Sequence, residues 1–500
     1  MKRIFPILML LLGWSLNAQT IYVKHNASGA NNGASWANAY TSLEQALSVA
    51  SPGQTIWVAA GTYKPTASSD YTFPVADGMQ LYGGFAGTES SLNQRNIAAN
   101  PTILSGDING DDIPGNFTDN RSDNSQHVVT CIELSSNPGV VVDGFTIRNG
   151  HTLLGTGNPD LSRRGGGILI YTKSTVRNCV IEQNFGDTGA AIAALDALSN
   201  GCVVENCLIQ NNKAETSGAF FLRNTNGATI KKCVFKTNTV NRGALYPSGT
   251  LNVQIDSCLF EKNNAGENFG AGMFCWQATF SLTNSIFRGN KAANAAGMYI
   301  DNRDGGDLVV IDHCLFEQDT ATSFGGAGIY GWQASFNLKN TIFRENYAPN
   351  AAAIYCNGRE FDSSFSLEGC LFEKNINTDY GATFWNNRTN YTVTDCEFKD
   401  NVAPSSGAAI YNGDTTIFLV SNSLFQANRG NYAAAIANYG IGCYGTFENC
   451  TFRDNLATQG GGAASNGFKA DVEYKGCEFI ENKGSFAAAI FTQNDTTRLR

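Results

Sequence analysis

An alternation of acidic and amide side chains between residues 105 and 112 has the composition of a calcium-binding loop. The segment reads SGDINGDD, in which Asp107, Asn109 and Asp111 stand two residues apart. Calcium takes oxygen ligands, and a complete loop also supplies a bidentate carboxylate at its twelfth position. That position, counted from Asp107, is Thr118. We therefore interpret the segment as a solvated insertion, with a calcium site as the alternative, and we expect no other cofactor.

Fourteen cysteines are the second source of possible chemistry. Nine recur at one position of a repeat, namely Cys179, Cys207, Cys233, Cys258, Cys314, Cys370, Cys396, Cys450 and Cys477. Ser285, Thr341 and Ser423 hold that position elsewhere, which indicates a small, inward-facing side chain and not a redox or zinc site. Stacked Cβ atoms would lie roughly 4.8 Å apart, whereas a disulfide needs about 3.8 Å. We predict mostly reduced, buried thiols.

A stripe of aromatic rings recurs in seven successive repeats. The rings are Tyr246, Phe274, Tyr299, Tyr330, Tyr355, Trp385 and Tyr411. Because side chains alternate between the faces of a strand, the rings point outward if the apolar residue beside each points inward. Outward rings are suited to bind a glycan or a partner surface. Rings also favour strands and stack on one another without any ligand, so both interpretations stay open.

The positions of these residues follow a repeat of about 27 residues. The motif runs from NCVIEQN (178–184) to GCEFIEN (476–482), and its second positions are 25 to 29 residues apart. Each unit also holds a small-residue run such as GAAI (189–192) and a short strand pattern such as FSLTN (280–284). Three short strands per unit without a helical pattern predict an all-β, right-handed, three-sided parallel β-helix. Helical repeats lack support, and a propeller blade needs about 40 residues.

Two columns of the repeat have structural roles. An Ile or Phe column, from Ile181 to Phe479, is expected to fill the interior. Three residues later stands an Asn, replaced once by Asp319, from Asn184 to Asn482. Since Asn tolerates positive φ and bonds backbone at turns, we predict a ladder of asparagine turns.

The start of the chain differs from the repeats. Residues 1–18 read as a signal peptide, with Lys2 and Arg3 before an apolar stretch and cleavage after Ala18. Residues 19–150 read as a cap with irregular first coils, including a short helix over 43–50 with Ser42 as N-cap. Residues 151–500 read as the regular coils. The chain stops at Arg500 after a small-residue run, so we expect either a fragment or another covering element.

Charge and hydropathy exclude some partners. The net charge is -9, with only four histidines, which argues against nucleic acid because that partner requires a basic face. No later segment has the length and hydrophobicity of a transmembrane span. The protein is expected to be secreted, in the extracellular space or on the outer-membrane surface.

Two stretches resemble known families. NNGASWANAY, TIWVAAGTYKPT, LYGGFAGTE and TILSGDI, within residues 31–108, resemble the opening of secreted β-helix repeat proteins of the Bacteroidetes type. The alternation of GGA(I)-type runs with FxxN is similar to the repeats of chlamydial polymorphic outer membrane proteins, which are surface adhesins. The resemblance implies a pectin lyase-like parallel β-helix displayed at the cell surface.

The fold raises an enzymatic alternative, because pectate lyases and polygalacturonases are also parallel β-helices. Of the polygalacturonase motifs, DD (111–112), NGH (149–151) and NTD (377–379) occur in the wrong order, without RIK. Acids and bases for a lyase would come from Asp301, Arg303, Asp304, Asp307, Arg359, Glu360, Asp362 and Arg388, or from His127 and His151. Such loops are usually solvated ion pairs.

The sequence therefore predicts a non-catalytic β-helix that binds a polysaccharide or a surface protein through its long face. The alternative is a polysaccharide lyase or glycoside hydrolase acting in a groove on that face. Fold alone does not decide between them.

Overall fold

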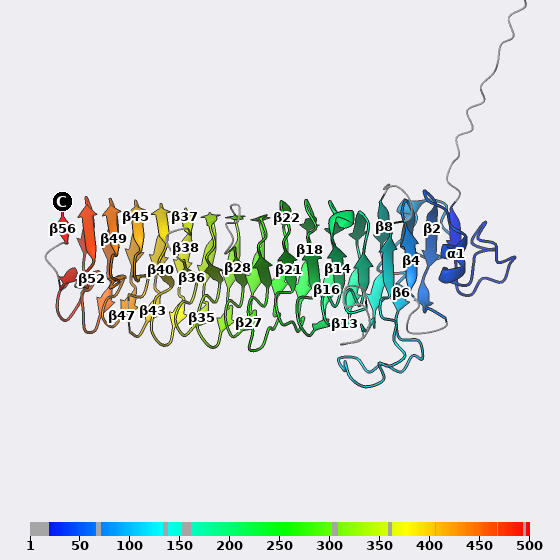
Figure 1. The fold of residues 1–500 in the computed structure, drawn as a ribbon, viewed down its shortest axis with the longest axis horizontal. Coiled ribbons are helices and arrows are strands. Elements are labelled where there is room, and N and C mark those ends of the chain that lie inside the picture. Colours follow the sequence, from blue (N-terminus) through cyan, green and yellow to red (C-terminus); the bar gives the residue numbers. More distant parts are fainter. Residues whose placement is uncertain are drawn as a thin grey trace, which may run out of the picture.

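The chain forms a right-handed parallel β-solenoid whose coils are stacked along one axis (Figure 1). The computed structural model describes residues 20–66, 72–133, 139–152, 162–302, 309–358, 363–405, 407–467, 469–493 and 497–500. The signal peptide predicted for residues 1–18 lies outside these ranges. The predicted three-sided β-helix is confirmed: the three main sheets hold 17, 15 and 15 strands.

One coil shows the pattern that the others repeat. β25 (Phe280–Thr283) belongs to the first sheet and β26 (Ile286–Arg288) to the second sheet. β27 (Lys291–Ala292) belongs to a short sheet at the next corner, and β28 (Met298–Asp301) to the third sheet. The short sheet is an addition to the three strands per coil that the sequence predicts.

The sheets run through nearly the whole stack. The first sheet extends from β1 (Ile21–Val23) to β56 (Arg498–Leu499), and the second from β3 (Gly61–Tyr63) to β54 (Glu478–Ile480). The third sheet consists of β4 (Phe73–Ala76), β7 (Val129–Ile132), β10 (Ile168–Ile170), β14 (Ile192–Leu195), β18 (Phe220–Arg223), β21 (Leu245–Ser248), β24 (Met273–Trp276), β28, β32 (Ile329–Trp332), β36 (Ile354–Asn357), β40 (Phe384–Asn387), β44 (Ile410–Asn412), β48 (Ile436–Asn438), β52 (Ala464–Asn466) and β55 (Ile490–Thr492).

The first end of the stack is covered by α1 (Leu43–Val49), as the sequence predicts (Figure 1). The Ser42 side chain accepts a hydrogen bond from the backbone N–H of Gln45, which satisfies one free donor at the helix start. Leu43, Ala46 and Leu47 are buried. The helix thus closes the apolar end that an uncovered first coil would expose to water.

The interior is filled by stacked phenylalanines of the second sheet. Phe235 and Phe260 have ring centroids 4.7 Å apart, and the same parallel stacking continues coil by coil to Phe452 and Phe479 at 5.1 Å. These rings are buried except at the last coil. The predicted apolar column is therefore the core of the solenoid.

The asparagine ladder is present, but its backbone conformation differs from the expectation. The side-chain amide of Asn212 donates to the carbonyl of Ile181 at 2.9 Å and to Oδ1 of Asn238 at 3.1 Å. The prediction that the ladder residue itself takes positive φ is wrong. The residue before it does, as at Thr237 with φ 50° and Lys262 with φ 54°. That residue makes the turn, and the inward-facing amide bonds the carbonyl of the core residue in the coil before, as Asn238 does with Ile209 at 2.9 Å.

The cysteine column is a row of small buried side chains, as predicted. All 14 cysteines lie in the described ranges as free thiols, and only Cys477 is partly exposed. The thiol of Cys207 donates to the carbonyl of Val176 at 3.6 Å. In the next coil after Cys258, the Ser285 hydroxyl accepts from the backbone N–H of Cys258 at 3.0 Å. The cysteine thiols and the Ser285 hydroxyl therefore occupy the same position of the repeat, and both hydrogen-bond to backbone there.

A second asparagine ladder inside the last coils was not predicted. Asn386, Asn412, Asn438 and Asn466 are fully buried on the inner face of the third sheet. The Asn412 amide donates to Asn438 Oδ1 at 2.8 Å, and the Tyr391 hydroxyl donates to Asn412 Oδ1 at 2.7 Å. A core position that is apolar in earlier coils is thus polar and hydrogen-bonded here.

Candidate binding surface

The predicted aromatic stripe lies on the outer face of the third sheet. In β24, Met273 and Cys275 point into the core and are fully buried, so Phe274 and Trp276 point outward. Parallel pairing places Tyr299 beside Phe274 and Asp301 beside Trp276. Two outward columns therefore run along this face, and we call them the ring column and the outer column.

The ring column is continuous over eight coils. Ring centroids of successive members are 4.7 to 5.6 Å apart from Phe221 to Tyr411. The eight members are Phe221, Tyr246, Phe274, Tyr299, Tyr330, Tyr355, Trp385 and Tyr411. All seven predicted residues are thus brought together, and Phe221 extends the column by one coil. Six of them, from Phe221 to Tyr355, belong to an apolar cluster separate from the core, and Trp385 packs against that cluster.

Stacking leaves little of these rings accessible. Tyr246, Phe274, Tyr299, Tyr330 and Tyr355 are only 3 to 8% exposed, whereas Trp385 and Tyr411 are partly exposed. Burial raises the pKa of Tyr355 to about 12, so its hydroxyl stays protonated at ordinary pH. The rings point outward as the alternation predicts, but most of their area contacts other rings.

Further aromatic side chains flank the ring column on the side of the short sheet. Phe269 and Phe324 are each 36% exposed. The Phe269 centroid is 5.2 Å from Tyr299, and that of Phe324 is 5.1 Å from Tyr355. They widen the apolar surface beyond the seven predicted rings.

The outer column contains the side chains that the sequence analysis missed. Trp276, Asp301 and Trp332 stand on successive strands, in register. Both tryptophans are partly exposed, and Asp301 is 1% exposed. The signal was available, because WQAT (276–279) and WQAS (332–335) occupy the same place in two similar stretches of sequence.

The acidic segment forms a cluster of three carboxylates. It belongs to the long loop between β6 (Thr102–Ser105) and β7, which leaves the side of the stack (Figure 1). Ligand oxygens of Asp107, Asp111 and Asp123 lie within 4.8 Å of one another. Asn109 donates its backbone N–H to Asp123 Oδ2 at 2.8 Å. Asp123, which lies past the twelfth position, supplies the additional carboxylate that a count from Asp107 does not find.

A buried ion pair supports this loop. Arg121 and Asp112 lie 2.9 Å apart, with side chains 1% and 4% exposed. Burial raises the pKa of Asp112 to about 6, against the lowering effect of the Asn124 amide and the Arg121 charge. Nδ1 of His151 lies 3.0 Å from the Arg121 carbonyl. The ion pair and the histidine contact thus tie the loop to the stack.

The proposed acids and bases of a lyase are not brought together among the described residues. Asp301 lies in β28 and Arg388 follows β40, three coils further along, which is about 14 Å at the strand spacing. His127 has Nδ1 3.1 Å from the Gly165 carbonyl, and burial lowers its pKa. Arg303, Asp304, Asp307, Arg359, Glu360 and Asp362 lie outside the described residues.

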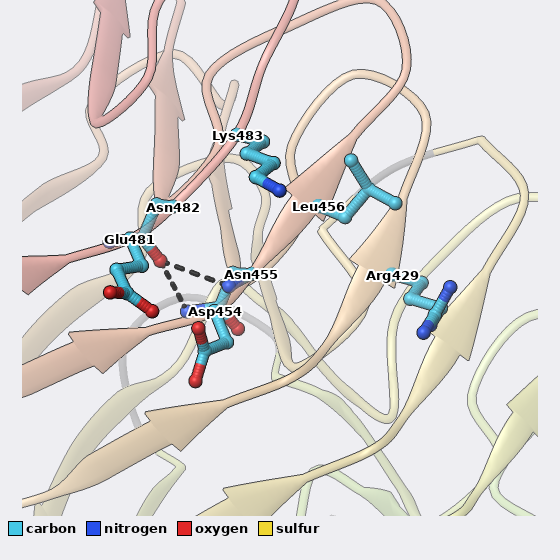
Figure 2. Close-up of a pocket in the computed structure, with 7 residues that line it drawn as sticks. All are labelled: Arg429, Asp454, Asn455, Leu456, Glu481, Asn482 and Lys483. Atoms are coloured by element: carbon cyan, nitrogen blue, oxygen red, sulfur yellow. Dashed lines mark hydrogen bonds between the residues drawn. The ribbon is translucent and has the colours of Figure 1, made fainter.

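Two hollows lie away from the ring column. Figure 2 shows the first, of about 650 Å³, at the corner between the second and short sheets of the last coils. It is lined by Arg429, Asp454, Asn455, Leu456, Glu481, Asn482 and Lys483. Its lining includes two acidic and two basic side chains. The two asparagines are members of the ladder and are bonded to each other at 2.9 Å. The second, of about 470 Å³, lies on the first sheet around Phe365, Tyr391 and Phe418.

Comparison with known proteins identifies the repeat architecture. The family model described as "Right handed beta helix region" matches residues 107–293 and 271–455. Metabotropic glutamate receptor-like protein R of Dictyostelium discoideum is 26% identical over 363 residues, covering 65% of this chain and 21% of that protein. Protein Q of the same organism is 24% identical over 331 residues, covering 64% and 26%. The chain thus spans about a fifth to a quarter of the length of these relatives.

Solved structures give a distant likeness. Pectate lyase Pel9A is 12% identical, with a TM-score of 0.34 over 68% of this chain and 78% of that one. A mannuronic acid-specific polysaccharide family 6 lyase from human gut microbiota is 11% identical, with a TM-score of 0.36 over 86% and 83%. Within the described part of the chain, no helix has the length and apolar character needed to cross a membrane.

Proposed function

Because the chain belongs to the right-handed β-helix family, we propose that it is a non-catalytic protein that binds a polysaccharide or a surface protein along the outer face of its third sheet. The observation that carries this proposal is the apolar face built on the ring column, where Trp276, Trp332, Trp385 and Tyr411 are partly exposed and Phe269 and Phe324 are each 36% exposed. These rings lie on several coils, so an extended partner can contact more than one of them at once.

The distribution of acids and bases supports binding over catalysis. General acid–base chemistry needs its groups within hydrogen-bond reach of one reacting bond. Asp301 and Arg388 are three coils apart, and His127 and His151 each contact a backbone carbonyl. The lyase or hydrolase alternative therefore has weaker support from the described residues than the binding surface has.

Export to the cell surface or the medium is part of the same proposal. Its support is the charged and apolar N-terminal stretch that ends at Ala18. The full chain would be produced with its own start in a Gram-negative host, and the N-terminus of the exported protein would be sequenced by mass spectrometry. A mature exported protein that begins at Gln19 agrees with the proposal. A protein that stays in the cytoplasm and still carries Lys2 and Arg3 contradicts it.

The function is tested by a glycan array run beside a reducing-end assay on plant, algal and host polysaccharides. Binding without the release of reducing ends is the expected result. A matched pair of variants places the surface: Trp385→Ala removes a partly exposed ring of the column, and Tyr444→Ala removes a 54% exposed ring on the first sheet. Loss of binding in the first variant alone supports the proposal. Bond cleavage by the purified protein would overturn it.

A further inference from the structure

Exposed aromatic rings recur at one corner of the stack, on every second coil. The corner lies between the short sheet and the third sheet. The rings just before β32, β40, β48 and β55, which are alternate strands of the third sheet, are those of Phe324, Tyr380, Tyr432 and Phe486. Their exposed fractions are 36%, 65%, 49% and 68% in that order. We call these four rings the corner row.

The four rings hold one position of the repeat. Each is followed directly by a small residue, namely Gly325, Gly381, Ala433 and Ala487. Parallel bridges join Gly325 to Ala351 in the next coil, and they join both Ala433 and Ala487 to Gly461 in the coil between them. Successive rings are therefore two coils apart, which is about 10 Å at the strand spacing.

The intervening coils leave space between the rings. The corresponding position is held by Asn350, which is only 8% exposed, in the coil between Phe324 and Tyr380. In the coil between Tyr432 and Phe486 it is held by Gly460, which has no side chain. A ligand that lies along the corner thus meets separate rings and not a continuous apolar strip.

The fold gains little from these rings. Phe324 packs edge-on against Tyr355, at 5.1 Å between centroids, and Phe486 lies 5.3 Å from Phe491. About two thirds of Tyr380 and of Phe486 nevertheless faces solvent, so burial contributes little to stability there. A row of large exposed rings is typical of a surface that contacts a partner.

Hydrogen-bonding side chains run beside the corner row. The residues directly before the rings are Ser323, Asp379, Asn431 and Ser485, and Gln459 holds this place in the coil before Phe486. All of them are exposed except Asn431, which is partly exposed. Hydroxyl, carboxylate and amide groups can exchange hydrogen bonds with sugar hydroxyls, and an aromatic face packs against the apolar C–H face of a sugar ring. Both kinds of contact are therefore available along one line.

The spacing of the rings indicates the shape of the polymer. In an extended β-1,4-linked polysaccharide each sugar is turned over relative to the one before, so every second sugar presents the same face to the same side. One sugar of such a chain is about as long as one coil of the stack is high. Every second sugar therefore meets a ring of the corner row. Chains with α-1,4 or β-1,3 linkages wind into helices and lose this register.

We propose that the corner row is a binding track for an extended β-1,4-linked polysaccharide, with every second sugar packed on one of the four rings. The polymer runs parallel to the axis of the stack, and the side chains beside the rings bond its hydroxyl groups. This proposal rests on the proposed function. It names the linkage of the partner and adds a surface next to the outer face of the third sheet.

The first test compares linkages on the full chain. Depletion from solution would be measured with cellulose, chitin and β-1,4-mannan, and with starch and β-1,3-glucan as particles of similar surface area. At least one β-1,4-linked polymer should bind about tenfold more tightly than the other two linkages. Equal or better binding of starch or β-1,3-glucan overturns the track.

The second test uses oligosaccharides of the polymer that binds, from two to seven sugars long. Three sugars are needed to reach two rings, five to reach three, and seven to reach all four. Affinity measured by isothermal titration calorimetry should therefore rise in steps at three, five and seven sugars, because each added contact forms within one complex. An affinity that is independent of length contradicts the track.

Variants locate the contact. Tyr380→Ala and Tyr432→Ala should each weaken polymer binding by about tenfold, the size of one aromatic contact. The double variant should weaken it further, because one polymer meets both rings. Tyr444→Ala, which removes a 54% exposed ring on the first sheet, is the matched control and should bind as the unchanged protein does. Thermal unfolding of each variant establishes that it is folded.

The outcomes separate this proposal from the proposed function. If a polysaccharide binds, Trp385→Ala weakens it, and Tyr380→Ala and Tyr432→Ala do not, the corner row is wrong and the outer face of the third sheet is the surface. If no polysaccharide binds, the corner row is overturned, and the proposed function depends on the surface-protein partner.

Discussion

The side-chain amide of Asn290 donates a hydrogen bond of 2.9 Å to Oδ1 of Asp319, in the fully buried asparagine ladder. Asp319 is the one acid at a ladder position. Its Oδ2 has no hydrogen-bond partner among the described residues. At the corresponding place in the next coil, the Asn346 amide donates to the Phe316 carbonyl at 2.9 Å. Burial raises the pKa of Asp319 well above its usual range, because loss of solvation disfavours the ionised form. An ionised carboxylate also cannot donate the bond that Asn346 donates in the next coil.

Asp319→Asn is therefore expected to stabilise the protein. The gain should be about 1 to 3 kcal/mol near pH 8, the cost of one unsatisfied buried polar group. A folded-state pKa above the unfolded value means that stability is fully present below about pH 3.9 and is lost as the pH rises toward the folded pKa. Denaturant unfolding from pH 4 to 9 should show this slope in the natural protein and a flatter one in the variant.

The reverse substitution is the control. Asn401→Asp places a carboxylic acid where the Asn401 amide donates to Phe372 at 2.9 Å, and it should create the same loss of stability at high pH. If the stability of Asp319→Asn falls with pH as steeply as that of the natural protein, Asp319 is not the source of the pH dependence.

Thr237→Asn should also raise stability. Thr237 has φ 50°, a conformation that is strained for a β-branched residue and tolerated by Asn. The gain should be about 0.5 to 1 kcal/mol, since the strain at such a residue is of order 1 kcal/mol or more. Thr392→Asn, at an exposed position of β41 (Asn390–Thr394), is the matched control and should lower stability. Thermal melts of both variants decide the point.

Calcium binding at Asp107, Asp111 and Asp123 is a separate expectation from their proximity. Adding millimolar calcium to the chelated protein should raise the melting temperature, because a ligand that binds only the folded state stabilises it. Asp123→Asn should abolish that shift, whereas Asp454→Asn, an exposed acid elsewhere, should leave it intact. An unchanged melting temperature with and without calcium supports the solvated insertion instead.

Thiol labelling tests the cysteine column. In the folded protein a maleimide should react with Cys477, the one partly exposed thiol, and 14 thiols should react after denaturation without a reductant. Cys477→Ser should remove the reaction in the folded state. Disulfide-linked peptides from the column, found by mass spectrometry, would contradict the reduced state.

Two substitutions separate the structural and binding contributions of the ring column. Tyr330→Ala should cost about 3 kcal/mol, because Tyr330 is 8% exposed and contacts Tyr299 and Tyr355. Tyr330→Phe should cost little. If the phenylalanine variant keeps its stability but loses polysaccharide binding, the Tyr330 hydroxyl contacts the ligand and the Tyr330 ring stabilises the fold.

The period of the sequence identifies stacked positions well and turn conformations poorly. Every residue at one place of the repeat lies in one column, so the aromatic stripe, the cysteines and the ladder could be found by counting. Counting does not show that Thr237 takes the turn conformation while Asn238 faces inward, because both occur once per coil. Asp123 reaches Asp107 only through the path of an irregular loop, which no period describes. Trp276 and Trp332 are two coils apart, with Asp301 at the same position in the coil between them. Because this position does not hold one type of residue in successive coils, counting along the repeat does not single it out.

The asparagine ladder that includes Asn212 and Asn238 joins each coil to the next, and it therefore affects how the protein responds to a pulling force. Each coil is bonded mainly to the coils before and after it, so a force applied at one end meets a series of similar small barriers. Each coil that detaches frees about 27 residues, or roughly 90 Å of extended chain. A solenoid of this kind would lengthen in regular steps and leave the remaining coils folded.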